Sequence, residues 1–471
     1  MPRKQRKEKD FEWPQLQFRW RNFRSFKDTG WFDIRPVTIL LGANNSGKTN
    51  LVRPLLLLKQ TLDSGDEAIA LKITGPLADV GTFRNLVHQG RVHDTVNFDI
   101  RFHALERQTQ KLKPVGAYPP AELCLEFGMG HNPLEVELRS FEVSDLCGRK
   151  CLIRKHVDLG RYSLRTPLPL PAPLKSFVKT IKPSHFLFLP GKLLNAALEE
   201  DRHRSKTRKM KQKTRKSLTK MLTSGAGVVY FLFVATTANH ISGVLSNMSY
   251  IGPLREYPKR FYESTEEIPQ AVGVRGELTP HILRLTTDKQ VIAKTNEWLE
   301  RFGLARRISY EPFHGDLFAL NVTDLERQST VDFSDSGFGL SQLLPLIVQG
   351  FHSKSRAILF LEQPEIHLNP KLQSELANLF AAISVDKKVV IVETHSEHLV
   401  LRIRTLIAEK KLRAEDVALY YIEKKKGSSI LRRIPISHDG HIEPNEWPTG
   451  FFADAISESL NLASAQSGQK S

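Results

Sequence analysis

Cysteines and long apolar runs are both scarce in this chain of 471 residues. Its three cysteines, Cys124, Cys147 and Cys151, are an odd number at no zinc-ligand spacing, which fits a reducing compartment better than a disulfide framework. The longest apolar run, 226–235, is about half of a membrane span, so we expect a buried core helix and no membrane partner. Residues 1–7 are basic but are followed by acidic residues, not by an apolar segment, which argues against a secretory signal. We therefore expect a cytoplasmic protein.

Acidic residues are few relative to basic ones, with 51 Asp and Glu against 68 Lys and Arg and a net charge of +17. This excess favours a polyanionic partner, because Lys and Arg that neutralise phosphates release counterions. The excess of basic residues is concentrated in the segment 201–220. This segment has almost no apolar face, so it is not expected in the core. Two interpretations stay open for it: a solvated arm, or a contact with nucleic acid or an acidic protein.

Residues 42–49 read Gly-Ala-Asn-Asn-Ser-Gly-Lys-Thr and follow the apolar strand pattern of 37–41. This is a complete G-x-x-x-x-G-K-[ST] phosphate-binding loop, whose backbone amides curl around a phosphate. Lys48 is expected to reach the β/γ oxygens, and Thr49 to offer a hydroxyl to Mg²⁺ at the N-terminus of a helix. The pattern predicts a site for ATP and Mg²⁺. The candidate nucleotide contacts are Gly42, Asn44, Asn45, Ser46, Gly47, Lys48, Thr49 and Asn50.

The pattern of the chain changes several times along its length. Residues 1–15 form a basic arm, and 16–165 form an α/β lobe whose part from about 95 onward alternates with period two, which predicts an antiparallel β-meander. In that part Val96, Phe98, Ile100 and Phe102 alternate with polar residues, as do Leu123, Leu125 and Phe127, and Leu134, Val136 and Leu138. A proline-rich stretch then opens a mainly helical insertion, 166–248, that includes the basic segment 201–220. A second lobe is expected over 249–456, and a frayed tail over 457–471.

The second lobe holds three polar motifs near apolar elements. The apolar runs 357–361 and 388–392 are typical of strands covered on both faces, and each is followed by a glutamate. Glu362 is the candidate that holds Mg²⁺ through water, and His395 follows the second run. A Ser/Gly turn over 334–342 precedes an apolar helix that we expect to begin at Leu343. The amides and hydroxyl of this turn suit an anion.

The order of these motifs resembles the head of ABC-type ATPases of the SMC, RecF and OLD kind. The segments 250–255, 362–370 and 447–452 narrow the resemblance to stand-alone AAA/ABC-like ATPases of anti-phage systems such as Septu and PARIS. It covers about residues 15–90 and 245–455. The resemblance implies an α/β fold: an ABC-type P-loop ATPase head with a flanking antiparallel β-meander and a mainly helical insertion.

The resemblance also implies roles for single residues. Glu362 takes the Walker B position, and His395 is the switch histidine. The Ser/Gly turn, with Ser336, Gly337 and Gly339, would address the γ-phosphate of a neighbouring protomer, which implies a homodimer or a higher homo-oligomer. The stretch Arg24, Ser25 and Phe26 resembles the part that approaches adenine, and Gln89 is either a Mg²⁺-sensing glutamine or an ordinary loop residue.

One position departs from the family pattern. The usual catalytic glutamate falls on Gln363, whose amide can orient water but cannot accept its proton. Either Glu365 supplies the base, or hydrolysis is slow and ATP binding is the working state. We expect weak turnover. His398 is expected on a helix surface or at a helix cap, and Arg255 either has a structural role or pairs with phosphate.

These observations lead to a principal functional hypothesis and to alternatives. The principal one is an ATPase sensor or scaffold of an anti-phage complex that controls a separate effector chain, a nuclease or toxin. The region after His395 lacks the acidic cluster of the Toprim nuclease that OLD proteins append, so any nuclease is expected on another chain. The alternatives are a RecF- or SMC-like DNA-maintenance ATPase that grips duplex through 201–220, and an ATP-locked scaffold without turnover.

Overall fold

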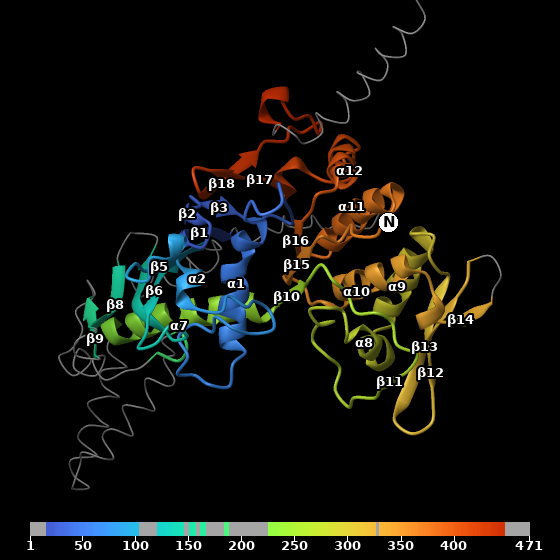
Figure 1. Cartoon of the computed structure of the whole chain (residues 1–471), viewed down its shortest axis with the longest axis horizontal. Helices are drawn as coiled ribbons and strands as arrows, with labels where there is room; N and C mark the ends of the chain where they lie inside the picture. Colours follow the sequence, from blue (N-terminus) through green and yellow to red (C-terminus); the bar gives the residue numbers. More distant parts are fainter. Residues whose placement is uncertain are drawn as a thin grey trace, which may run out of the picture. The chain divides into compact units, whose positions relative to one another are not determined.

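The computed structural model describes residues 16–102, 120–145, 150–156, 161–165, 183–187, 225–325 and 329–447. The chain forms two compact units, each assembled from separate stretches of sequence (Figure 1). The first unit comprises Met1–Asp33, Asn50–Ser246 and Lys425–Ile430, and the second comprises Ile34–Thr49, Asn247–Lys424 and Leu431–Ser471. The predicted arm 1–15, basic segment 201–220 and tail 457–471 lie outside the described residues, as does most of the segment 447–452.

A six-stranded sheet forms the centre of the second unit. Its strands lie in the order β10 (Met248–Ile251), β15 (Ile358–Glu362), β16 (Val389–Glu393), β4 (Val37–Gly42), β17 (Val417–Lys425) and β18 (Ser428–Ile434). The first five strands pair in parallel. All residues of β4 and β16 are buried, as expected for parallel strands covered on both faces. The prediction of an α/β core around the phosphate-binding loop is confirmed.

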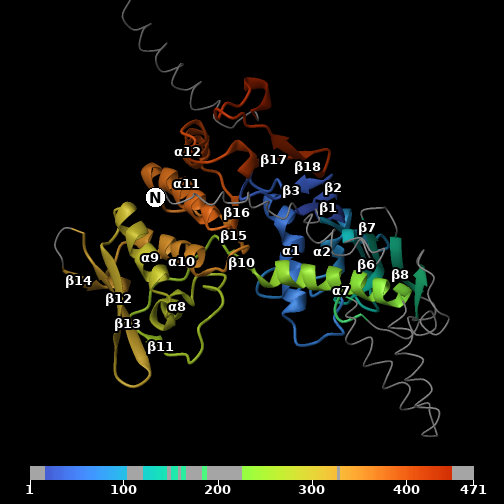
Figure 2. The same cartoon turned by 180° about the vertical axis from the view of Figure 1, so that it is seen from behind.

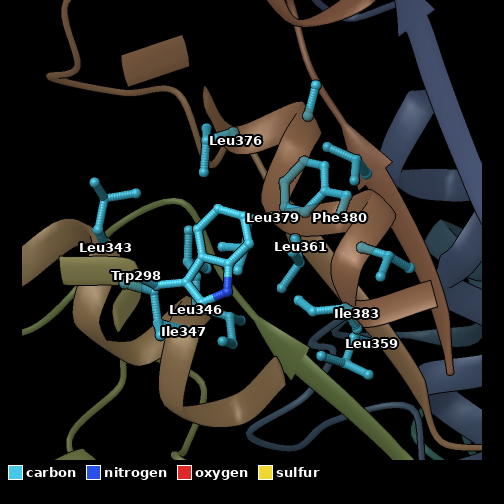
Figure 3. Packing of buried hydrophobic residues seen from close by; sticks show 14 of the residues in the cluster. Trp298, Leu343, Leu346, Ile347, Leu359, Leu361, Leu376, Leu379, Phe380 and Ile383 are labelled. Carbon is cyan, nitrogen blue, oxygen red and sulfur yellow. The ribbon is translucent and has the colours of Figure 1, made fainter. Parts of the chain in front are cut away.

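Helices pack against this sheet through a continuous apolar core. They are α8 (Thr279–Leu285), α9 (Lys289–Arg301), α10 (Phe338–His352), α11 (Pro370–Val385) and α12 (Glu397–Ala408). Figure 3 shows Trp298 of α9, Leu346 of α10, Phe380 of α11 and Leu361 of β15 converging in one cluster. The start of α11 is specified locally, because Asn369 caps its first turn by accepting from the Leu372 amide.

Four short strands build a smaller sheet in the same unit. They are β11 (Tyr262–Glu263), β12 (Arg307–Pro312), β13 (Leu317–Thr323) and β14 (Thr330–Asp332), with β13 pairing antiparallel to the other three. This sheet was not predicted from the sequence. Strands β11 and β14 are too short to show an alternating pattern, and β12 and β13 do not alternate strictly between buried and exposed residues. Short 3-10 turns occur at Phe333–Asp335, Ala414–Asp416 and Pro444–Glu446.

The first unit is built on an antiparallel sheet. Its strands are β1 (Leu16–Phe23), β2 (Phe26–Asp28), β3 (Phe32–Asp33), β5 (Val96–Phe102), β6 (Pro120–Met129), β7 (Val136–Asp145), β8 (Lys150–His156) and β9 (Arg161–Arg165). Strands β5 to β9 pair with their sequence neighbours, so the predicted meander is confirmed. The inclusion of Leu134 in its alternating pattern was wrong. Leu134 lies in the turn before β7 and is 65% exposed, because the strand begins only at Val136.

The helices of this unit are α1 (Lys48–Leu62), whose first two residues belong to the second unit, α2 (Phe83–Leu86) and α7 (Gly225–Ser246), with a 3-10 turn at His88–Gly90. In both views α7 lies beside β6 (Figure 2). The helix predicted at the apolar run 226–235 is confirmed as part of α7. Of the rest of the predicted helical insertion, only the segment 183–187 is described. Within the described residues, no helix is both long and apolar enough to cross a membrane.

Candidate nucleotide site

The phosphate-binding loop connects β4 to α1 and depends on three left-handed backbone positions. Gly42 has φ +152°, and a Cβ there would lie 2.3 Å from the carbonyl oxygen of Ile422, so only glycine fits. Asn45 and Gly47 have φ values of +60° and +103°. Asparagine and glycine tolerate this region at low cost, which lets the chain reverse tightly before the helix begins.

Lys48 is enclosed within the loop. Its Nζ donates to the carbonyl oxygens of Gly42 and Ala43, both at 3.0 Å, and the residue is only 4% exposed. Burial lowers the pKa of Lys48, while the charges of Glu393, Glu365 and Glu362 act to raise it. The Lys48 ammonium therefore lies near three carboxylates at the end of the sheet.

Thr49 lies between two of these carboxylates. Its Oγ1 donates to Oε2 of Glu393 at 2.8 Å and lies 3.3 Å from Oε1 of Glu362. The two glutamates are register partners at the ends of the parallel strands β15 and β16, which explains why both reach the same hydroxyl. Because a hydroxyl has one proton and two lone pairs, Thr49 can keep this hydrogen bond and still offer an oxygen lone pair to a cation.

A third strand holds Glu362 from the other side. The phenol of Tyr250, on β10, donates to Oε2 of Glu362 at 2.6 Å, and its ring stacks on Phe360 with centroids 5.2 Å apart. Sequence reasoning missed both Tyr250 and Glu393 as site residues. Glu393 carried a usable signal, since it ends an apolar strand run just as Glu362 does.

The turn after Glu362 is braced by a buried arginine. Gln363 has φ +44°, and its backbone N–H donates to the backbone carbonyl oxygen of Glu393 at 2.8 Å. Arg255 is 5% exposed, and its Nη1 donates to the carbonyl oxygens of Pro253 at 2.8 Å and Gln363 at 3.2 Å. Burial lowers the pKa of Arg255 to about 10. Two roles were expected for Arg255, a structural one and pairing with phosphate. Its hydrogen bonds to backbone carbonyl oxygens of this turn are those of a structural role.

The backbone N–H of His395 donates a hydrogen bond to Oε1 of Glu365 at 2.7 Å. Glu365 is 9% exposed, and burial raises its pKa, whereas the bond from His395 acts to lower it. Burial lowers the pKa of the His395 ring, and the charge of Lys48 lowers it further. Both side chains are thus biased toward their neutral forms. The neighbouring His398 is exposed on α12, as expected.

The Ser/Gly turn lies at the start of α10. Ser336 Oγ donates to the carbonyl oxygen of Phe333 at 2.6 Å, and Gly337 occupies the N-cap position. The expected helix start at Leu343 was wrong: α10 begins at Phe338, so Gly339 lies in its first turn. Leu340 is 2% exposed, and its packing in the core explains why the helix extends through a glycine of low helix propensity.

The remaining candidates belong to the first unit. Asn50 Nδ2 donates to Ser25 Oγ at 3.0 Å, and Phe26 is fully buried. Arg24 has φ +49° and its carbonyl oxygen lies 2.7 Å from His88 Nδ1. Gln89 follows in the 3-10 turn with φ +56°. Their roles toward adenine and Mg²⁺ stay predictions.

The chemistry of the loop fits Mg²⁺. Within the described residues, no group of three or more His, Cys, Asp and Glu side chains could hold a metal ion. Mg²⁺ does not need one, because it keeps several waters and is bound by one or two carboxylates together with substrate phosphates. The Thr49 hydroxyl, Glu362 and Glu393 supply such oxygen donors. They would hold the ion and its waters when nucleotide is bound.

The loop after β4, the parallel sheet and the acids that end β15 and β16 are the features of a P-loop ATPase. A family model described as AAA ATPase domain matches residues 280–400, and one described as Protein of unknown function (DUF3696) matches 412–462. No curated protein matches the chain.

Two solved structures show how far the similarity to SMC heads extends. An SMC head bound to the C-terminal winged-helix domain of ScpA is 12% identical, with a TM-score of 0.40, over 90% of this chain and 98% of that one. The SMC head domain from Thermotoga maritima is 11% identical, with a TM-score of 0.37, over 90% and 100%. The class of the protein rests on the loop, the sheet and the matched ATPase domain.

Proposed function

We propose that this chain binds ATP and hydrolyses it slowly, and that it serves as the sensor or scaffold of an anti-phage defence complex whose effector is a separate chain. The observation that carries the catalytic part is the convergence of Lys48, Thr49, Glu362 and Glu393 at one end of the parallel sheet. The defence role is supported by the resemblance of the segments 250–255 and 362–370 to the ATPases of such systems.

The proposed turnover is slow because of the residues beside the loop. The loop amides and Lys48 would bind the phosphates, and Thr49 with Glu362 would hold Mg²⁺, whose charge would neutralise that of the phosphates. The amide of Gln363 can orient a water molecule but cannot take its proton. Glu365 is the nearby carboxylate that can, yet burial disfavours the ionised form that a base needs.

Signalling would come from ATP-dependent pairing of two copies. In the proposed closed state, Ser336 and Gly337 of one copy contact the γ-phosphate that is bound by the phosphate-binding loop of the other copy. ATP can shift this equilibrium only if it binds the closed state more tightly than the open one. A slow ATPase would keep the closed state long enough to hold or release an effector.

A phage-protection assay tests this function. Cells that carry the chain with its neighbouring genes should lose protection when Lys48→Ala is introduced, and the purified variant should lose ATP binding. The matched control is Lys59→Ala, which removes a lysine of the same helix that forms an ion pair with Asp63. Protection that persists in the Lys48→Ala strain would refute the defence role.

The net charge of +17 favours a second candidate, a DNA-maintenance ATPase. This function requires duplex affinity that falls steeply with salt and is lost when the basic residues of 201–220 are replaced by glutamine. Binding titrations at several salt concentrations measure this directly. An absent salt slope would remove the case for DNA.

A further inference from the structure

Glu393 lies closer to the phosphate-binding loop than sequence motifs suggest. It ends β16, the strand that pairs with β4, whereas Glu362 ends the next strand outward. The hydroxyl of Thr49 is 2.8 Å from Glu393 and 3.3 Å from Glu362. Of the two acids, Glu393 therefore accepts the better hydrogen bond from the residue that P-loop proteins use to bind Mg²⁺.

The carboxylate of Glu393 is buried beside the phosphate-binding loop. The residue is 5% exposed, and its Oε1 is 3.9 Å from Lys48 Nζ, which is the outer range of an ion pair. A buried carboxylate beside the hydroxyl that binds Mg²⁺ in P-loop proteins is placed to attract a divalent cation. Gln363, the residue that follows β15, is uncharged and contributes no such carboxylate.

We propose that Glu393 is the second carboxylate of the Mg²⁺ site. It orients the Thr49 hydroxyl so that the oxygen lone pair faces the ion, and with Glu362 it accepts hydrogen bonds from the waters of the ion. Glu362 is fixed separately by the phenol of Tyr250, so each acid has its own anchor. The inference rests on the proposed function, since it requires ATP at this loop.

This role predicts effects of opposite sign with and without metal. Without Mg²⁺, the negative charge of Glu393 repels the phosphates of the nucleotide. With Mg²⁺, the same charge attracts the ion that bridges protein and phosphates. A residue that merely supports the fold of the loop would weaken nucleotide binding in both conditions.

Calorimetric titration with the non-hydrolysable analogue AMP-PNP separates these outcomes, first in EDTA and then at increasing Mg²⁺. For Glu393→Gln, the Mg²⁺ concentration at half-maximal binding should rise about ten- to hundredfold, the usual cost of losing a residue that orients metal ligands. Binding in EDTA should be as tight as in the wild type or tighter. Glu362→Gln should behave similarly, and Glu297→Gln, which removes an exposed glutamate of α9, should change neither quantity.

Three results would overturn the proposal: an unchanged Mg²⁺ requirement, a parallel loss of binding with and without metal, or no binding by the wild type. Only the last also removes the proposed function, so the two failures are distinguishable. Glu393→Asp guards against a folding defect of the glutamine variant. This variant keeps the negative charge on a side chain shorter by one methylene. It should bind AMP-PNP like the wild type in EDTA, and its Mg²⁺ concentration at half-maximal binding should lie between those of the wild type and Glu393→Gln. If Glu393→Asp needs as much Mg²⁺ as Glu393→Gln, charge is not the cause.

Discussion

The phenol of Tyr250 donates a 2.6 Å hydrogen bond to Oε2 of Glu362, so the acid proposed for the Walker B position is oriented by β10, a strand outside the phosphate-binding loop. The bond is short, as is usual when the acceptor is a carboxylate. The Tyr250 ring also stacks on Phe360 with an interplanar angle of 18°. The hydroxyl can therefore be removed while the packing of the ring is kept.

Tyr250→Phe should reduce the free energy of unfolding by about 1.5–3 kcal/mol, the usual range for a hydrogen bond to a charged group. It should also weaken Mg²⁺-dependent nucleotide binding, because Glu362 loses the group that fixes its orientation. Urea unfolding and AMP-PNP titration measure the two effects. Unchanged values in both would show that the phenol does not orient Glu362.

Arg255→Ala should be destabilising, because it leaves the carbonyl oxygens of Pro253 and Gln363 without their donor in a buried turn. A loss of about 1–3 kcal/mol in unfolding free energy is expected for an unsatisfied buried group. The matched control is Arg260→Ala, since Arg260 pairs with Asp335 at the surface and such pairs contribute about 0–1 kcal/mol. Equal losses for the two variants in urea unfolding would contradict the role assigned to Arg255.

The pH dependence of stability should contain a contribution from Glu365. Burial raises its pKa, so the folded state binds the proton more readily than the unfolded chain. This group therefore favours folding most below its unfolded pKa, and that contribution is lost as the pH rises through the raised value. Glu365→Gln is neutral at every pH and should flatten this part of the stability profile. Urea midpoints measured from acid to neutral pH would show an unaltered slope if the assignment were wrong.

Gln363→Glu should accelerate ATP hydrolysis, because it places a proton acceptor at the position that the proposed function assigns to the residue orienting the attacking water. A positioned general base contributes about 10²–10⁴-fold, so a rise of tenfold or more in kcat is expected even with imperfect geometry. Steady-state phosphate release measures it. If Glu365→Gln abolishes turnover and Gln363→Glu has no effect, Glu365 is the base and the amide at 363 is not limiting.

The sequence predicted those parts of the fold that have strong periodicity or fixed motif spacing. The strands that end at Glu362 and Glu393 were predicted from continuous apolar runs, and the meander from alternation. The start of α10 was predicted five residues too late, at Leu343 instead of Phe338, because Gly339 favours a turn by local propensity while the core contact of Leu340 favours helix. The short sheet from β11 to β14 carried too little pattern to predict.

The site was predicted unevenly for a similar reason. Spacing along the chain identified Lys48 and Thr49, because the loop is one continuous segment. Contacts between strands are set by sheet order, which no local pattern encodes. Tyr250 and Glu393 reach the site from two strands on either side of β15, and only the strand order β10-β15-β16-β4 brings them together.

The most direct test of the account is calorimetric titration of the purified wild-type chain and its Lys48→Ala variant with ATP in Mg²⁺. The account predicts saturable binding by the wild type and by Lys59→Ala, and none by Lys48→Ala, because the Lys48 ammonium is the cation enclosed by the loop. Failure of the wild type to bind ATP, or equal binding by the Lys48→Ala variant, would contradict it.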